Sequence, residues 1–197
     1  SQIGANCLAL PSTSKLEGLV LMDQELVVQD ASSQTIALLL QQIKFQKKGR
    51  IQFWDCCAAS GGKSLLLHEL EPTVTILASD NRASILQNLE IRFQQAGIRN
   101  FRRREIDLLA EINAFEKESF DGIILDAPCS GSGTWARTPE MLTQFKEDKI
   151  AYFVNLQRTI AENAIQFLKV GQPLIYITCS VFKEENEEAI AYFLANL

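Results

Sequence analysis

The sequence predicts an α/β fold, built on a mostly parallel and doubly wound sheet. Short apolar runs without polar alternation are separated by segments of helical period. Strands of that kind belong to a parallel sheet that helices cover on both faces. The length of 197 residues, with 47% hydrophobic and 22% charged side chains, fits one globular domain with a substantial core.

The expected elements follow one another regularly along the chain. A first helix over residues 31–43 has Asp30 as its expected N-cap, because a carboxylate accepts hydrogen bonds from free amides of the first turn. A glycine at 97 is a plausible stop for a later helix. The expected strands cover residues 51–56, 73–79, 101–106, 120–126 and 172–178, and the remaining helices cover 61–70, 82–95 and 148–168. In the last helix, one apolar face is expected from Phe153, Leu156, Ile160, Ala164 and Phe167.

Composition restricts where the protein works. No apolar run approaches the roughly 20 residues of a membrane span, and the first residues do not resemble a signal peptide. We therefore expect a soluble, cytoplasmic protein. The five cysteines are an odd number with two adjacent, which argues against a disulfide framework and leaves packing, metal binding or catalysis.

The net charge of −5 counts against nucleic-acid binding, which depends on neutralising phosphates. A local basic cluster partly offsets this charge. It is either a nucleic-acid contact or a solvated strand edge, and it consists of Arg99, Arg102, Arg103 and Arg104.

Ligands of doubly wound sheets bind beyond the carboxyl ends of the strands, so candidate residues are sought there. A loop of small residues follows the first strand, and such residues let the backbone approach a ligand closely. Its GGKS ending suggests a phosphate-binding P-loop, but Cys57 occupies the position where that motif requires glycine. No GxGxxG dinucleotide motif is present.

Acidic residues follow the next two strands. Asp80 is placed to accept hydrogen bonds from both hydroxyls of a ribose, as acidic residues do in nucleotide-binding folds, and an N-cap role is its structural alternative. Asp107 follows the third strand and is a candidate partner for an adenine amine.

Two cysteines follow the last two strands. Asp126 and Cys129 end the fourth, in the segment DAPCSGSG, and Cys179 ends the fifth. Both thiols are expected to face one pocket, with Asp126 beside them, which favours catalysis over packing. Zinc is the rival use, but no CxxC spacing exists, and His68 is the only histidine. We expect no metal.

Together these segments resemble the Sun-type (Fmu) family of RNA cytosine-5 methyltransferases. The resemblance covers nearly the whole chain and runs through QDASSQ at 29–34, CAASGGK at 57–63, DAPCSG at 126–131, TCS at 178–180 and EENE at 184–187. It implies a Rossmann-like, S-adenosylmethionine-dependent methyltransferase fold. It also implies RNA as the partner, with ribosomal RNA favoured over transfer RNA.

The resemblance implies roles for individual residues. Cys179 is the expected nucleophile toward carbon 6 of cytosine, Asp126 is expected to hydrogen-bond the base, and Cys129 is expected to help resolve the adduct. In DNA cytosine methyltransferases the cysteine of the Pro-Cys pair is the nucleophile instead. The expected contacts of S-adenosylmethionine are Cys57, Ala58, Ala59, Ser60, Gly61, Gly62, Lys63, Asp80, Asp107 and Asp126.

The chain departs from the family at two places. Ser60 stands where the family usually has proline, and the chain ends at Leu197, before the final strand pair of related domains. We therefore expect residues 1–30 to be the tail of a preceding region, and 31–197 a C-terminally truncated catalytic domain. A P-loop-like nucleotide hydrolase and a non-catalytic RNA-binding module are the alternative functions.

Overall fold

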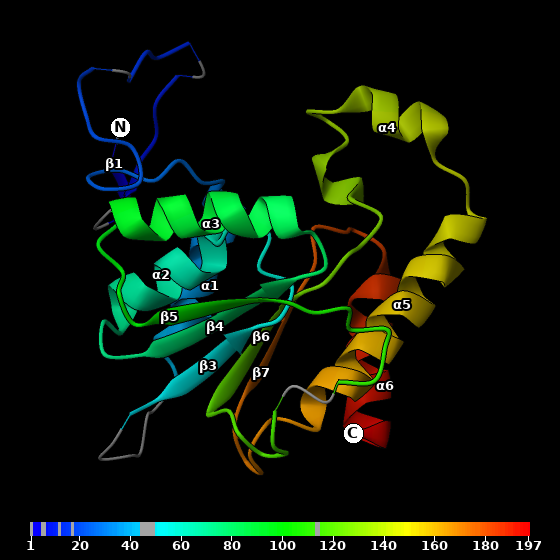
Figure 1. Cartoon of the computed structure of the whole chain (residues 1–197). Helices are drawn as coiled ribbons and strands as arrows, with labels where there is room; N and C mark the ends of the chain where they lie inside the picture. Colours follow the sequence, from blue (N-terminus) through cyan, green and yellow to red (C-terminus); the bar gives the residue numbers. More distant parts are fainter. Residues whose placement is uncertain (1, 5–6, 12, 17, 44–49, 113–114) are drawn as a thin grey trace.

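The computed structural model describes residues 2–4, 7–11, 13–16, 18–43, 50–112 and 115–197. Two strands form a separate antiparallel pair near the start, β1 (Gln2–Gly4) and β2 (Cys7–Leu8). The other elements form one α/β unit (Figure 1): α1 (Ala31–Leu40), β3 (Gln52–Asp55), α2 (Gly62–Leu70), β4 (Thr75–Asp80), α3 (Ala83–Gln95), β5 (Phe101–Glu105), β6 (Gly122–Asp126), η1 (Ser132–Thr134), α4 (Pro139–Gln144), α5 (Asp148–Ile165), β7 (Leu174–Ile177), η2 (Lys183–Glu185) and α6 (Glu187–Asn196).

The main sheet has five strands in the order β5-β4-β3-β6-β7, and every neighbouring pair is parallel. The chain builds outward from β3 through β4 to β5, and then returns to place β6 on the other side of β3. The order therefore reverses between β3 and β6. The loops after these two strands lie side by side at the switch point, where ligands of such sheets bind.

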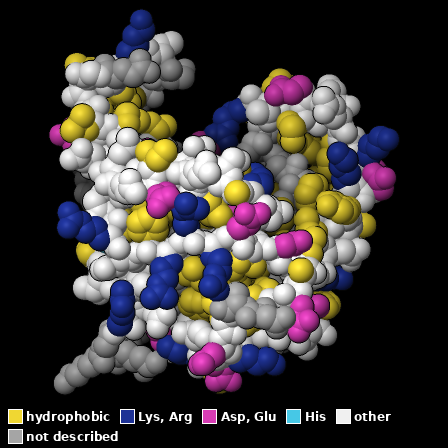
Figure 2. Space-filling view, viewed as in Figure 1, with side chains coloured by type: hydrophobic (Ala, Val, Ile, Leu, Met, Phe, Trp, Pro, Cys, Tyr) yellow, Lys and Arg dark blue, Asp and Glu magenta, His cyan; other side chains and the backbone are white. Residues whose placement is uncertain are grey.

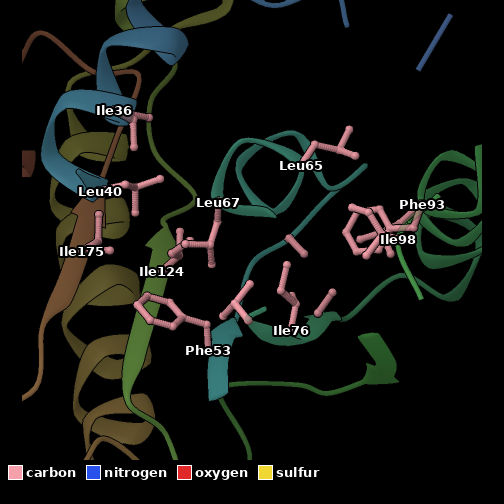
Figure 3. Close-up of a cluster of buried hydrophobic side chains, with 14 of the residues drawn as sticks. Ile36, Leu40, Phe53, Leu65, Leu67, Ile76, Phe93, Ile98, Ile124 and Ile175 are labelled. Atoms are coloured by element: carbon pink, nitrogen blue, oxygen red, sulfur yellow. The ribbon is translucent and has the colours of Figure 1, made fainter. Parts of the chain in front are cut away.

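Helices cover both faces of the sheet, because adjacent strand residues point to opposite sides. Phe53 packs with residues of α1, α2 and α3, whereas Trp54 packs with residues of α5 and α6. Figure 1 shows these two groups of helices on opposite faces of the sheet. Figure 3 shows the first of the two cores, in which side chains from these three helices meet the strands around Phe53 and Ile124. This three-layer arrangement confirms the predicted fold class.

The first helix corrects two expectations. It ends at Leu40, before residue 43. Asp30 has the extended backbone of an N-cap, but its side chain makes no capping hydrogen bond. Its carboxylate instead pairs with Arg137, a residue far away in the chain. Asp30 is therefore the N-cap residue, as predicted, but the expected capping hydrogen bond is absent, because a charged partner from another segment reaches the carboxylate.

The buried face of α5 also differs from the expected one. The helix ends at Ile165, and Val154, Gln157 and Ala161 are buried on it along with Ile160 and Ala164, whereas Phe153 and Leu156 are only partly buried. A glutamine thus occupies the centre of the face. The division of the chain at residue 30 stays a prediction.

Candidate active site at the switch point of the sheet

The loop between β3 and α2 has the backbone conformation of a tight turn. Ala59 has a φ of 47° and Gly61 a φ of 83°, both in the left-handed region. A Cβ on Gly61 would meet Phe93 of α3 at 2.5 Å, so the helix packs directly against this loop. Since only glycine combines that φ with that close approach, residue 61 is restricted to glycine for two reasons.

Asp80 is almost fully engaged with protein groups. Its carboxylate accepts hydrogen bonds from the Ala59 amide over 3.1 Å and from the Arg82 guanidinium over 2.8 and 2.9 Å, and it is 5% exposed. Burial is the largest single effect and tends to raise the pKa of Asp80, but the hydrogen bonds and charge of Arg82 and the bond from the Ala59 amide together lower the pKa. Asp80 therefore fixes the loop after β3, and Arg82 covers the carboxylate that was expected to face a ribose.

Asp107 lies at the same edge of the sheet. It is exposed, and its carboxylate accepts a hydrogen bond from the Leu109 amide over 2.9 Å.

An ion pair joins the two loops at the switch point. Lys63 Nζ lies 2.7 Å from Asp126 Oδ2, and both side chains are largely but not fully buried. The candidate cofactor loop is thereby tied to the candidate catalytic motif that follows β6. Among the hydrogen bonds of the described residues, none reaches the other carboxylate oxygen of Asp126, Oδ1.

The two cysteines at the ends of β6 and β7 are in contact. Cys129 Sγ and Cys179 Sγ lie 3.3 Å apart, and the Cys179 amide approaches Cys129 Sγ at 3.4 Å. Cys179 is exposed, whereas Cys129 is half-buried. Both thiols thus lie together at the carboxyl edge of the sheet, as predicted from the strand ends, and Cys179 is the more exposed of the two.

This contact makes the two thiols chemically unequal. The hydrogen bond from Cys129 lowers the pKa of Cys179 to about 7, although partial burial acts in the opposite direction. The same contact, together with burial, raises the pKa of Cys129 well above its usual range. Near neutral pH the thiolate therefore forms on Cys179, and a thiolate is the nucleophilic form of cysteine.

A buried carboxylate connects the loops that carry the two cysteines. Glu185 is 0% exposed. It accepts hydrogen bonds from the Ser130 amide and hydroxyl, over 2.9 and 2.5 Å, and from the Ser180 hydroxyl over 2.5 Å. Gln157 of α5 donates a further bond over 2.9 Å. Because Ser130 follows Cys129 and Ser180 follows Cys179, Glu185 sets the position of one loop relative to the other.

The backbones of the two loops also approach closely. The Gly133 amide donates to the Cys179 carbonyl over 2.8 Å, and a Cβ on Gly133 would lie 2.8 Å from that oxygen. Any side chain at position 133 would displace Cys179.

Asp55 lies beneath this region with an incompletely satisfied carboxylate. Ser64 donates to Oδ2 over 2.7 Å, whereas Oδ1 is buried without a hydrogen-bond partner. Burial raises the pKa of Asp55 to about 7.

Sequence reasoning located the strand-end residues but not these supports. Glu185 lies in the EENE segment, to which the sequence analysis gave no role, and no sequence pattern singled out Asp55.

Within the described ranges, no cluster of three or more His, Cys, Asp or Glu is arranged to hold a metal ion. Over the same residues, no helix is long and apolar enough to cross a membrane. Figure 2 shows the surface hollowed between the N-terminal segment and the region of α4, beyond the carboxyl ends of the strands.

Comparison with known families identifies this arrangement. Residues 21–197 match the family model described as 16S rRNA methyltransferase RsmB/F. The chain belongs to the RsmB/F family. Among curated members, ribosomal RNA small subunit methyltransferase B of Shewanella oneidensis is 37% identical over 172 residues, which cover 85% of this chain and 38% of that protein.

Solved structures agree with the RsmB/F assignment. NSun6 from Pyrococcus horikoshii, determined with the S-adenosylmethionine analogue SFG, superimposes with a TM-score of 0.75 at 25% identity, over 94% of this chain and 46% of that one. A methyltransferase homologue from the same organism gives a TM-score of 0.67 at 31% identity, over 86% and 51%. The fold is thus the Rossmann-like fold of S-adenosylmethionine-dependent methyltransferases. The chain spans less than two fifths of the length of the RsmB relative from Shewanella oneidensis.

Proposed function

We propose that this RsmB/F chain transfers a methyl group from S-adenosylmethionine to carbon 5 of cytosine in ribosomal RNA, through a covalent adduct with Cys179. The observation that carries the proposal is the cysteine pair, in which Cys129 lowers the pKa of an exposed Cys179 beside Asp126. Ribosomal RNA is favoured over transfer RNA because curated relatives are described as ribosomal RNA methyltransferases.

The residues around the loop after β3 suit the cofactor. Ala58, Ala59 and Gly61 place no large side chain in this loop, and the first turn of α2 has no side-chain cap, so its amides can meet a carboxylate. S-adenosylmethionine supplies an electrophilic methyl group when it is bound. A ribose contact at Asp80 requires Arg82 to turn away, which the 56% exposure of the Arg82 side chain permits.

Cys179 starts the reaction. Its thiolate forms a bond to carbon 6 of cytosine, and the electron pair released onto the ring makes carbon 5 nucleophilic. Asp126 hydrogen-bonds the base at N3 and the exocyclic amine, which stabilises charge as the adduct forms. After carbon 5 carries the methyl group, its proton passes to water. The electron pair of that C–H bond restores the double bond between carbons 5 and 6, and the bond between carbon 6 and sulfur breaks to return Cys179 as a thiolate. Cys129, held protonated, assists this last stage.

The substrate must present an unstacked cytosine. Cys179 and Asp126 lie at the carboxyl edge of the sheet, and a base within a duplex does not present its carbon 6 to a nucleophile there without leaving its stack. The chain as a whole is acidic, so little of the affinity for RNA comes from its overall charge.

The test is to incubate the protein with tritiated S-adenosylmethionine and unmodified 16S ribosomal RNA, digest the RNA and separate the nucleosides. The proposal expects label in 5-methylcytidine, and transfer RNA serves as the comparison substrate. Label in another nucleoside, or ATP hydrolysis in place of transfer, would overturn it.

A further inference from the structure

Arg92 connects three parts of the molecule that are distant in the chain. It lies in the last turn of α3. Its Nε and Nη2 donate to both carboxylate oxygens of Asp23, over 2.9 and 2.7 Å. Its Nη1 donates to the carbonyl oxygen of Ser60 over 2.8 Å and to the Ser60 hydroxyl over 3.1 Å. All three guanidinium nitrogens are therefore used.

The residue that Arg92 contacts, Ser60, lies in the tight turn after β3. A proline at position 60 would restrict the backbone by fixing φ, whereas serine does not. The hydrogen bonds of the described residues include none from the Ser60 amide, so the position does not require an N–H. Ser60 lies between Ala59 and Gly61, both with positive φ, in a turn that serine by itself restrains less than proline does.

Arg92 supplies a restraint of another kind. A charged donor bonded to a carbonyl oxygen and a hydroxyl of one residue fixes both its backbone and its side chain. The arginine is itself immobilised, because Asp23 holds the other edge of the guanidinium with side chains that are 21% and 19% exposed. Phe93, the next residue, packs against Gly61. Arg92 and Phe93 of α3 thus contact Ser60 and Gly61 of the loop, the first pair by hydrogen bonds and the second by packing.

The N-terminal segment takes part in this arrangement. Asp23 lies in the segment before α1, which runs beside α3 in Figure 1. From the same segment, Gln29 donates to the carbonyl oxygen of Gly62 over 2.8 Å. The segment therefore reaches the loop twice, directly at Gly62 and through Arg92 at Ser60.

We propose that Arg92 is a positioning residue for the cofactor loop, held by Asp23, and that its bonds to Ser60 supply a restraint that serine by itself does not provide in this turn. The inference rests on the proposed function, since it assigns the loop to S-adenosylmethionine. Arg92 itself does not touch the cofactor. It preorganises the backbone that does, and preorganisation of a binding loop raises affinity by reducing the ordering cost of binding.

The experiment is a double-mutant cycle on the affinity of the full chain for S-adenosylmethionine, measured by titration calorimetry. Arg92→Ala is expected to raise Kd by about tenfold, or ~1.4 kcal/mol, in the Ser60 background. In the Ser60→Pro background the same substitution is expected to raise Kd by less than about twofold, because the ring supplies the lost restraint. A merely structural contribution of Arg92 would cost the same in both backgrounds.

Further variants distinguish the positioning role of Arg92 from the proposed methyltransferase function. Arg103→Ala breaks another arginine–carboxylate pair, with Glu90, and should leave Kd unchanged. Arg92→Lys keeps the charge but loses the forked geometry, so it should weaken binding in the Ser60 background even where Arg92→Ala fails to fold. Equal losses in the two backgrounds, or no loss on either Arg92 substitution, overturn the inference while the proposed function stands. Failure of the unaltered chain to bind S-adenosylmethionine overturns both.

Discussion

The sulfur atoms of Cys129 and Cys179 lie 3.3 Å apart, although the two residues are 50 positions apart in the chain. Parallel strands β6 and β7 end side by side and bring the thiols together. Their contact gives the two thiols different roles, since it lowers the pKa of Cys179 and raises that of Cys129. Most of the following predictions test this division or the groups that maintain it.

Replacement of the proposed nucleophile should abolish transfer without affecting the cofactor. We expect Cys179→Ala to give no 5-methylcytidine above background, because the nucleophilic sulfur is lost and burial still disfavours a thiolate on Cys129. Its Kd for S-adenosylmethionine should stay within about twofold of that of the unaltered chain, because the cofactor loop is separate. Cys7→Ala is the control. Retained transfer in Cys179→Ala would assign the nucleophile elsewhere.

Removal of the second thiol should trap the intermediate. In Cys129→Ala, Cys179 still bonds to cytosine, but release of the product is impaired. A denaturing gel with labelled RNA should then show a slowly migrating protein–RNA band. The Cys129→Ala/Cys179→Ala double variant should lack it, and a band that persists there would place the covalent bond on another residue.

The reactivity of Cys179 should depend on pH through its neighbour. Thiolate reacts with iodoacetamide and thiol does not, so modification of Cys179 should rise with a midpoint near pH 7. In Cys129→Ala the midpoint should move upward, because the largest cause of the lowered pKa is lost. Mass spectrometry of the Cys179 peptide measures both curves, and fully buried Cys56 should stay unmodified. Identical midpoints would disprove the coupling.

Glu185 should be needed for geometry and not for cofactor binding. Glu185→Gln keeps the shape but turns an acceptor into an NH₂ group among donors from Ser130, Ser180 and Gln157. We expect a stability loss of about 1–3 kcal/mol in urea unfolding, and an upward shift of the Cys179 alkylation midpoint as the loops separate. Exposed Glu187→Gln is the matched control. An unchanged Cys179 midpoint in a folded Glu185→Gln chain would remove Glu185 from the site.

Asp55 should make stability fall as pH rises. Its folded-state pKa of about 7 lies above the ordinary value of 3.8, so the folded chain binds the proton more tightly than the unfolded chain. The stabilisation is complete below pH 3.8 and is lost progressively up to about pH 7. We expect Asp55→Asn to be more stable at pH 8 by a few kcal/mol at most, with a flatter pH dependence. Urea unfolding at pH 5 and pH 8 measures this, and parallel pH profiles of the two chains would contradict it.

The strands and the strand-end residues were predictable because their signals are local. Apolar runs such as residues 120–126 have the length and composition of buried strands, and β6 lies within this range. Parallel strands all end at one edge, so the sequence alone also predicted that Asp126, Cys129 and Cys179 lie together. The buried face of α5 was predicted only in part. Apolar periodicity does not reveal that Gln157 is buried, because its partners Glu185 and Tyr176 come from later segments.

The sequence by itself determined the order of elements, the parallel sheet and the residues at its carboxyl edge, because periodicity and small-residue loops act over short distances along the chain. Only the tertiary structure decided which groups face one another. The hydrogen bonds of Arg92 to Asp23 and Ser60, of Glu185 to both cysteine loops, and between the thiols join residues that fold from separate segments. Since hydrogen bonds and pKa shifts depend on distances of a few ångströms, they exist only once packing has fixed those segments.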